Sequence, residues 1–369
     1  MRTPVTEMFG VEFPLVAFSH CRDVVAAVTN AGGMGVLGAV AHDPASLEHE
    51  LAWIDDQVGG RPYGVDVLVP GKLADTGGSG GPGIPDAHRA FVADLLTRYG
   101  VEPPEAAPGS GSGSGRRVTK EGASELIDVA LGHPVSLIAS ALGPPPPEMV
   151  AAARAKGVPV AALVGTVEHA RRQVAAGADV IIAQGGEAGG HTGEISTMVL
   201  VPQVVDVVAP LPVLAAGGIA TGRQMAAALA LGAAGVWCGS VWLTTEEAET
   251  MPAVKEKMLA ATSRDTIRSR SRTGKPARQL ASAWTAEWEG PDSPGALPMP
   301  LQMILAEGAM RRINHASQAG VPGAQDLANY FVGQVVGQMN AVKPARQVVY
   351  DILDEFGDAL SRLDQIAKD

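Results

Sequence analysis

The chain has 369 residues, of which 46% are hydrophobic and 18% charged, and its formal net charge is −11. This composition is typical of a folded protein with a large core, and it excludes a disordered chain. The acidic balance also argues against a long nucleic-acid partner, because neutralising phosphates requires a basic face.

Cys21 and Cys238 are the only cysteines. They are too few for a disulfide framework or a four-ligand zinc site, so we expect two reduced thiols and no metal site. The first residues contain no apolar core of signal-peptide length, and no uninterrupted apolar run reaches about 20 residues. The sequence therefore predicts a cytoplasmic protein that does not cross a membrane.

Short runs of β-branched residues alternate along the chain with Ala-rich segments of helical periodicity, a pattern typical of repeated strand–helix units. Most of the runs are continuously apolar, which indicates strands buried on both faces. The predicted strands are Pro14–Phe18, Gly35–Gly38, Tyr63–Val69, Val135–Ser140, Val158–Val164, Asp179–Gln184, Leu211–Ala216 and Gly235–Gly239. The predicted helices between them include Arg22–Ala31, Pro44–Asp56, Glu148–Lys156, Val167–Ala176, Thr197–Val208 and Arg223–Leu231.

Eight such strands separated by helices favour a closed parallel barrel, the (β/α)8 TIM barrel. A doubly wound open sheet is the competing architecture. It usually has fewer strands and a phosphate-binding loop early in the chain.

One segment, about residues 71–120, interrupts the alternation after the third predicted strand. It contains glycine-rich stretches at 77–83 and 109–115 on either side of a predicted helix at Asp86–Tyr99. A long insertion after a barrel strand lies on the face that carries the active site. The segment fits either a lid over that site or a flexible excursion.

The sequence after the eighth strand has mainly helical periodicity, interrupted at Pro291–Pro300. We therefore predict a barrel over residues 1–245, with the insertion, and a mainly helical C-terminal extension over residues 246–369 that packs on it. The Ala-rich helix faces are compatible with a homodimer, but nothing in the sequence locates the dimer contact.

The most unusual strand end follows the sixth predicted strand, where the segment from Gly185 to Gly193 has the sequence GGEAGGHTG. Glycines allow the backbone to approach a flat ligand closely. An isolated histidine is more often structural than catalytic. In a glycine-rich loop at the catalytic face of a barrel, however, His191 is a candidate general base, since the pKa of histidine lies near neutrality.

The next two strand ends predict an anion site. Gly217 and Gly218 follow the seventh strand and lead into a helix, whose free N–H groups and dipole favour a phosphate. Gly239 and Ser240 follow the eighth strand, and barrels commonly bind phosphate in these two loops. Either turn alone could be an ordinary one. A sugar-phosphate enzyme would also fit, but no lysine or carboxylate pair stands at the strand ends. The residues thus indicate a phosphate-bearing cofactor or substrate beside a candidate base.

Taken together, these segments resemble the signature of nitronate monooxygenases, formerly called 2-nitropropane dioxygenases. The resemblance covers about residues 5–340 without the insertion, and it is specific for the superfamily rather than for one substrate. It is carried by Asp179–Gly185 with Glu187–Gly193, Pro212–Ile219, Ala228–Ala233, the early turn Asn30–Gly35, and the weaker, later landmarks Gly274–Arg278 and Gly333–Gln334.

Members of this family use non-covalent FMN, molecular oxygen and a small-molecule substrate. The resemblance implies that His191 is the catalytic histidine, which removes the α-proton of a nitroalkane, whereas a nitronate needs no such step. The cofactor supplies the redox chemistry and the protein positions it. The residues implied to bind FMN are Ala17, Phe18, Ser19, Asp66, Gln184, Gly189 and Gly190, with Gly217, Gly218, Gly239 and Ser240 at its phosphate.

Two positions depart from the family pattern. The first strand commonly ends in Ala-Pro-Met, where this chain has Ala17, Phe18 and Ser19, followed by His20. His20 is a second ionisable candidate, with a packed structural role as the simpler interpretation. Asp66 stands where the family often has asparagine. Its carboxyl group can accept a hydrogen bond from the flavin, and its charge disfavours an anionic reduced flavin.

The reaction stays open between related activities. The leading prediction is FMN-dependent oxidation of alkyl nitronates, and of nitroalkanes, to a carbonyl compound and nitrite. The same superfamily contains flavin-dependent enoyl-acyl carrier protein reductases and NAD(P)H:quinone reductases, and Gly193–Leu200 resembles the reductase loop equally well. An NAD(P)H-dependent reductase is therefore the alternative, and a barrel that binds flavin without turnover is the non-enzyme alternative.

Overall fold

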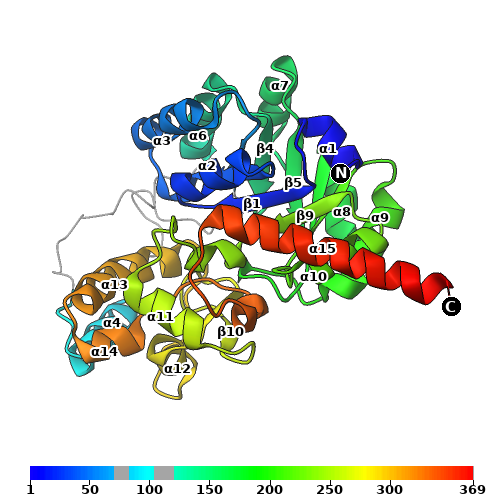
Figure 1. Ribbon diagram of the computed structural model, residues 1–369. Helices are drawn as coiled ribbons and strands as arrows, with labels where there is room; N and C mark the ends of the chain where they lie inside the picture. Colours follow the sequence, from blue (N-terminus) through cyan, green and yellow to red (C-terminus); the bar gives the residue numbers. More distant parts are fainter. Residues whose placement is uncertain (70–82, 104–119, 369) are drawn as a thin grey trace.

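Eight parallel strands close into a barrel in the computed structural model, which describes residues 1–69, 83–103 and 120–368. Residues 15–17 of the first strand pair with residues 236–238 of the last, so the sheet has no edge (Figure 1). The predicted TIM barrel is thereby confirmed, and the open sheet is excluded. The barrel strands are β1 (Leu15–Ser19), β2 (Met34–Gly38), β3 (Gly64–Leu68), β4 (Leu137–Ala141), β5 (Val160–Val164), β6 (Val180–Gln184), β8 (Val213–Ala216) and β9 (Gly235–Cys238).

Helices surround the barrel, and several begin at residues that cap free backbone N–H groups. Asp43 and Ser46 form a reciprocal capping box at α3, and Thr221 and Gln224 form one at α10. Such boxes satisfy donors that the first helical turn leaves unpaired. The helices of this layer are α2 (Arg22–Asn30), α3 (Pro44–Val58), α6 (Lys120–Gly132), α7 (Pro147–Ala155), α8 (Val167–Ala175), α9 (Thr197–Val208) and α10 (Gly222–Ala230).

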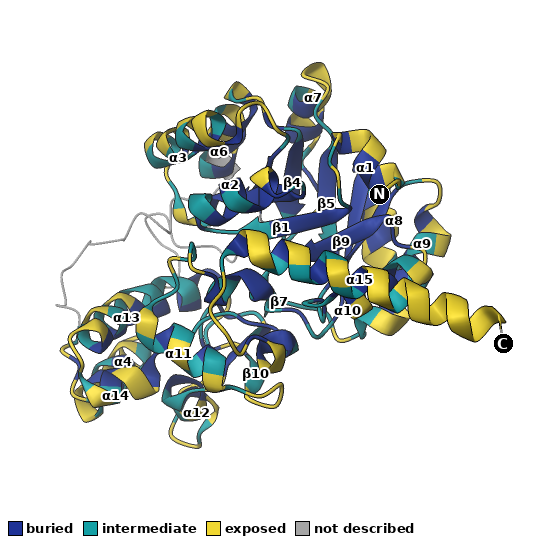
Figure 2. Ribbon diagram, viewed as in Figure 1, coloured by how far each residue is buried: buried dark blue, intermediate teal, exposed yellow. Residues whose placement is uncertain are grey.

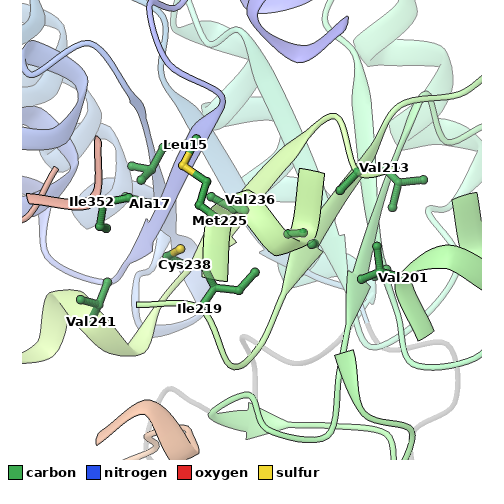
Figure 3. Packing of buried hydrophobic residues seen from close by; sticks show 14 of the residues in the cluster. Leu15, Ala17, Val201, Val213, Ile219, Met225, Val236, Cys238, Val241 and Ile352 are labelled. Carbon is green, nitrogen blue, oxygen red and sulfur yellow. The ribbon is translucent and has the colours of Figure 1, made fainter. Parts of the chain in front are cut away.

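Both faces of the barrel strands are buried, as the continuous apolar runs predict. Side chains such as Val16, Leu137 and Trp237 fill the interior, and α1 (Pro4–Phe9) adds Val5 to the same cluster. The other face of each strand packs against the helices. In Figure 3, Ala17 of β1 lies beside Leu15 in that outer layer of the wall.

A second hydrophobic core lies beside the barrel, and it joins two distant parts of the chain (Figures 1 and 2). Helix α4 (Asp86–Arg98), which matches the predicted helix at 86–99, contributes Leu95 and Leu96 to this core. Arg98 forms a 2.7 Å ion pair with Glu287. We refer to residues 86–101 and 251–339 as the cap. Its other elements are α11 (Pro252–Ala260), β10 (Thr266–Ser269), β11 (Ala277–Leu280), α12 (Ala283–Glu289), α13 (Leu301–Gln318), α14 (Pro322–Leu327) and the 3-10 helix η3 (Gln334–Gln338).

The glycine-rich stretches of the insertion, 77–82 and 109–115, lie outside the described residues. The choice between a lid and a flexible excursion therefore stays open for them. Helix α4, the described part between them, is a packed element of the cap: the ring of Phe91 lies 4.9 Å from that of Trp288, edge to face.

A three-stranded antiparallel sheet connects the cap to the barrel. Its order is β10-β11-β7, and β7 consists of only Gly190 and His191. Ala277 of β11 pairs with His191, and Arg278 pairs with Gly190. The sequence pattern does not predict this sheet, because its strands are too short to show a period-two alternation.

The last helix, α15 (Ala345–Lys368), leaves the cap and packs on α10 and α2 of the barrel. Val349, Ile352 and Phe356 are buried there, whereas the C-terminal turns are exposed (Figure 2). Although α15 has 24 residues, neither it nor any other described helix is long and apolar enough to cross a bilayer.

We predict that Gly222→Ala weakens this contact. A Cβ atom on Gly222 would lie 2.1 Å from both the carbonyl oxygen of Ile352 and the nitrogen of Phe356. Helix α15 would have to shift, at a cost of about 1–3 kcal/mol in the free energy of unfolding. Urea denaturation measures this change.

Gly357→Ala is the matched control, since a Cβ atom there meets nothing within 4 Å. This exposed helical position should gain about 0.5–1 kcal/mol. Equal stability of Gly222→Ala and the natural chain would contradict the observed packing of α15.

Candidate active site

A cavity of about 1300 Å³ lies at the carboxyl ends of the barrel strands, between the barrel and the cap. Ligand pockets usually measure roughly 300–1,000 Å³, so this one has room for a cofactor and a substrate together. Most of the predicted site residues line it, namely Phe18, Ser19, Asp66, Gln184, Gly189, Gly190, His191, Gly217, Gly218, Gly239 and Ser240.

Ala17 does not line this cavity. It is fully buried on the outer side of the wall with Leu15 and Cys238, as Figure 3 shows. Successive side chains of a strand point to opposite faces, so the alternation that turns Phe18 inward turns Ala17 outward. The Ala17 side chain is therefore not positioned to contact a ligand.

His191 is held by the sheet that joins barrel and cap. Its Nε2 lies 2.9 Å from Thr273 Oγ1, and the Thr273 hydroxyl donates to the Lys275 carbonyl oxygen at 3.1 Å. Because the hydroxyl proton is used in that bond, Nε2 is the nitrogen that donates. Nδ1 then carries the lone pair, and it forms no hydrogen bond with the described residues.

Burial and, to a smaller extent, the nearby Lys275 ammonium together lower the pKa of His191 to about 4. The imidazole is therefore neutral at pH 7, with Nδ1 able to accept a proton. A base with so low a pKa abstracts protons from carbon acids weakly, since general bases work best with a pKa near the operating pH.

Asp66 is a buried acid that has no hydrogen-bonding partner among the described residues. Burial raises its pKa to about 7, and its carboxyl group makes no hydrogen bond with any described residue. Buried polar groups are nearly always satisfied, so this carboxyl group is available to a ligand in the cavity.

His20, in contrast, has a structural role. Its Nδ1 donates to the Gly38 carbonyl oxygen at 3.0 Å, and its ring meets Phe18 edge to face at 5.1 Å. Burial lowers its pKa, an effect that the His42 charge adds to. The Phe18 ring in turn stacks on Trp237 at 6.0 Å. These rings form an aromatic wall at the barrel mouth.

The anion site differs from the sequence expectation in one respect. Most N–H groups at the N-terminus of α10 are already paired within the protein. Gln224 Oε1 accepts from the amides of Ala220 and Thr221, and the Glu355 carboxylate accepts from Gly222. Two backbone segments remain as candidates for binding an anion. One is the turn before the helix, where Gly217 and Gly218 have φ angles of 88° and 72°, and the other is the loop at residues 239–240.

Gly189 allows a close contact between two backbone segments of the protein. A Cβ atom on Gly189 would lie 2.9 Å from the nitrogen of Gly333, so the two backbones touch. The Gly333 amide also donates to Ser240 Oγ at 2.8 Å, and the Gln334 amide donates to the Glu187 carbonyl oxygen at 2.9 Å. The late landmark Gly333–Gln334 therefore holds the His191 loop against the loop after β9.

The lining fits a flavin by its chemistry. Phe18 and Trp237 supply apolar aromatic surface, and the Gly217–Gly218 turn supplies a backbone without side chains. Asp66 supplies a carboxyl group that no described residue hydrogen-bonds. Flat, amphipathic cofactors require such a mixture of apolar walls and a few polar groups.

Sequence reasoning missed the cap's contribution to the cavity. This contribution includes Arg272, Thr273, Lys275, Asn329, Tyr330 and Phe331. The family landmark Gly274–Arg278 indicates that this part of the chain contributes to the site. Nothing in a single sequence, however, shows that residues 270–276 and 329–331 meet at His191.

Comparison with known proteins agrees with this geometry. The family model for nitronate monooxygenase matches residues 2–355. A putative monooxygenase, Rv1533 from Mycobacterium tuberculosis, is 61% identical, covering 98% of each chain. The structure is also similar to nitroalkane oxidase from Streptomyces ansochromogenes (TM-score 0.80, 28% identity, 97% and 99% coverage) and to FabK from Thermotoga maritima (TM-score 0.72, 28% identity, 99% of each chain).

We predict that Lys275→Met raises the pKa of His191 from about 4 part of the way toward 6.5. The substitution removes a neighbouring positive charge and leaves the burial in place, so the protonated imidazole becomes less unfavourable. NMR titration of ¹⁵N-labelled histidine measures the pKa without turnover. An unchanged His191 pKa would show that the ammonium does not act on this ring.

Proposed function

The chain belongs to the nitronate monooxygenase family of flavin-dependent oxidoreductases, and we propose that it uses FMN and oxygen to oxidise alkyl nitronates to a carbonyl compound and nitrite. The family membership supports oxidation of nitro compounds in general. The choice of nitronates rests on the site, and the choice of FMN rather than FAD rests on the sequence resemblance to the family.

The observation that carries the proposal is the neutral His191 beside Lys275 in a cavity that fits a flavin. A nitronate is an anion, and the Lys275 ammonium attracts it. It also needs no proton removed, so a histidine with a pKa of about 4 does not limit its oxidation. A neutral nitroalkane must first lose its α-proton, and this imidazole is a weak base for that step.

FMN would be held by residues on opposite sides of the barrel mouth. Asp66 and Gln184 would meet the ring system, the aromatic wall of Phe18 would cover it, and the turns at Gly217–Gly218 and Gly239–Ser240 would receive the phosphate. When bound, FMN supplies the electron transfer between substrate and oxygen. The chain contributes positioning, exclusion of water and the proton acceptor Nδ1 of His191.

We predict that the flavin-loaded protein consumes oxygen with alkyl nitronates in the absence of NAD(P)H and releases nitrite. His191→Asn should slow nitroalkane oxidation roughly 100-fold or more, because the proton acceptor is lost. Oxidation of the pre-formed nitronate should change far less. An oxygen electrode and a nitrite assay, applied to both forms of one substrate, measure the difference.

Flavin content is the control, since the variant should bind the cofactor as the natural chain does. If no nitronate in a panel of chain lengths supports oxygen uptake by flavin-loaded protein, the proposed function is wrong. If His191→Asn slows both substrate forms equally, His191 has a role other than proton transfer.

A second candidate function is an FMN-dependent reductase that takes electrons from NAD(P)H and passes them to a quinone or an enoyl thioester. The similarity to FabK over 99% of both chains favours it, and the cavity has room for a large second ligand. NADPH oxidation that depends on an added enoyl thioester or quinone would support this function over nitronate oxidation.

We predict that Asp66 makes the potential of the bound flavin depend on pH. With a pKa of about 7, the carboxyl group is protonated below pH 7 and ionised above it. Its negative charge opposes electron uptake by the flavin, so the midpoint potential should fall more steeply above pH 7 than below it.

Asp66→Asn keeps the shape and removes the titration, so this break near pH 7 should disappear while the flavin stays bound. Spectroelectrochemical titration at several pH values measures it. The same break in the variant would assign the titration to another group.

A further inference from the structure

A second cavity, of about 250 Å³, is lined by the cap and by residues 185–196, the loop that carries His191. Strands β10 and β11 of the cap contribute Arg268 and Arg278, and the loop contributes Ser196. Of the described residues that line it, Gly193 alone also lines the active-site cavity. A ligand in this second cavity would therefore be distinct from the cofactor and the substrate.

The two arginines are placed directly opposite each other. Arg268 of β10 pairs with Arg278 of β11 in the antiparallel register, so both side chains project from the same face of the sheet. Like charges at directly opposed positions destabilise a pair of strands. Burial, and then the charge of Arg268, lowers the pKa of Arg278, as expected for two cations that repel each other.

Carbonyl and hydroxyl oxygens compensate these two charges only in part. Arg278 donates from Nε and Nη2 to the Gly186 carbonyl oxygen at 3.0 and 2.8 Å, and from Nη1 to Thr266 Oγ1 at 3.1 Å. Arg268 donates to the Thr192 carbonyl oxygen at 3.3 Å, and its Nε is buried without an acceptor among the described residues. Because these acceptors are neutral, most of the charge remains uncompensated.

Two carboxylates also line the cavity, but neither is well placed to neutralise the pair. Glu194 lies 3.5 Å from Arg268 Nη1, and its side chain is 86% exposed. Exposed ion pairs of this kind contribute little. The Glu187 charge acts on Arg278 through space, but the carboxylate accepts its hydrogen bonds from the amide and the hydroxyl of Thr197, at 3.0 Å each.

Two neutral donors complete the lining. Ser196 is the N-cap residue of α9, yet its side chain makes no capping hydrogen bond. Gln334 is held through its backbone N–H, which donates to the Glu187 carbonyl oxygen at 2.9 Å, and no described residue accepts from its side-chain amide. Two guanidinium groups, a hydroxyl and an amide form a donor set that suits the oxygens of a tetrahedral anion.

We propose that this cavity binds a phosphate group between Arg268 and Arg278, with Ser196 and Gln334 as further donors. A dianionic phosphate neutralises both opposed charges, whereas a carboxylate carries only one negative charge. Inorganic phosphate and the phosphate group of a larger monoester share this chemistry. In either case the anion connects the cap to the loop that carries His191, whichever reaction the active site performs.

Isothermal titration calorimetry tests this site with flavin-loaded protein, in which the cofactor fills its own phosphate site. Arg268→Gln should weaken the binding of inorganic phosphate roughly 10- to 150-fold, the effect of losing a hydrogen bond to a charged group. Ser196→Ala leaves both arginines in place and should cause a smaller loss. Arg264→Gln is the matched control with unchanged binding, because Arg264 is exposed and does not line the cavity.

Hydrogen exchange locates the bound anion. Phosphate should slow the exchange of backbone amides in residues 185–196, and Arg268→Gln should remove this effect. Adenosine monophosphate is the probe for a monoester: tighter binding of this nucleotide supports a site for an organic phosphate, and tighter binding of inorganic phosphate supports a site for the free ion. Absence of binding by both probes, or equal phosphate binding by Arg268→Gln and the natural chain, would overturn the proposal.

Discussion

The pairing of β7 with β11 is the contact on which the site depends. His191 belongs to a strand of two residues in a glycine-rich loop. Such a segment has little stiffness of its own. Its backbone is fixed by Ala277 and its side chain by Thr273, both from the cap. The cap is fixed in turn by its own hydrophobic core. The barrel therefore forms one side of the cavity, and the cap fixes the position of the histidine.

Burial gives three ionisable groups in the cavity their chemical character. It lowers the pKa of His191 to about 4, raises that of Asp66 to about 7 and lowers that of Arg272 to about 10. Each shift moves the group toward its neutral form, as expected where charges lose contact with water. At pH 7 the histidine is neutral, the aspartate is close to its pKa and the arginine keeps its charge. A cavity of this kind favours an anionic substrate over one that must first be deprotonated.

The barrel and much of its mouth could be predicted from the sequence, because strands buried on both faces leave continuous apolar runs that need no knowledge of partners. Gln184, at the end of its run, reaches the barrel mouth because all the strands point the same way. Asp66 lies in the middle of β3 and faces the same cavity. The sequence places Ala17 among the cofactor-binding residues, but its side chain lies on the outer side of the wall because its neighbour Phe18 points inward. The free helix amides expected after Gly218 are taken by Gln224 and by Glu355, which is more than 130 positions away in the chain. The contacts of Arg272 and Asn329 with the site join distant segments that no local pattern connects.

The most direct measurement of the central claim is the source of the electrons that reach the flavin. Flavin-loaded protein is mixed without oxygen with an alkyl nitronate, with NADH or with NADPH, and the flavin absorbance is followed in a stopped-flow instrument. We predict rapid loss of the absorbance with the nitronate and almost none with either nicotinamide. Rapid loss with NADH or NADPH, and none with the nitronate, would contradict nitronate oxidation and establish a reductase.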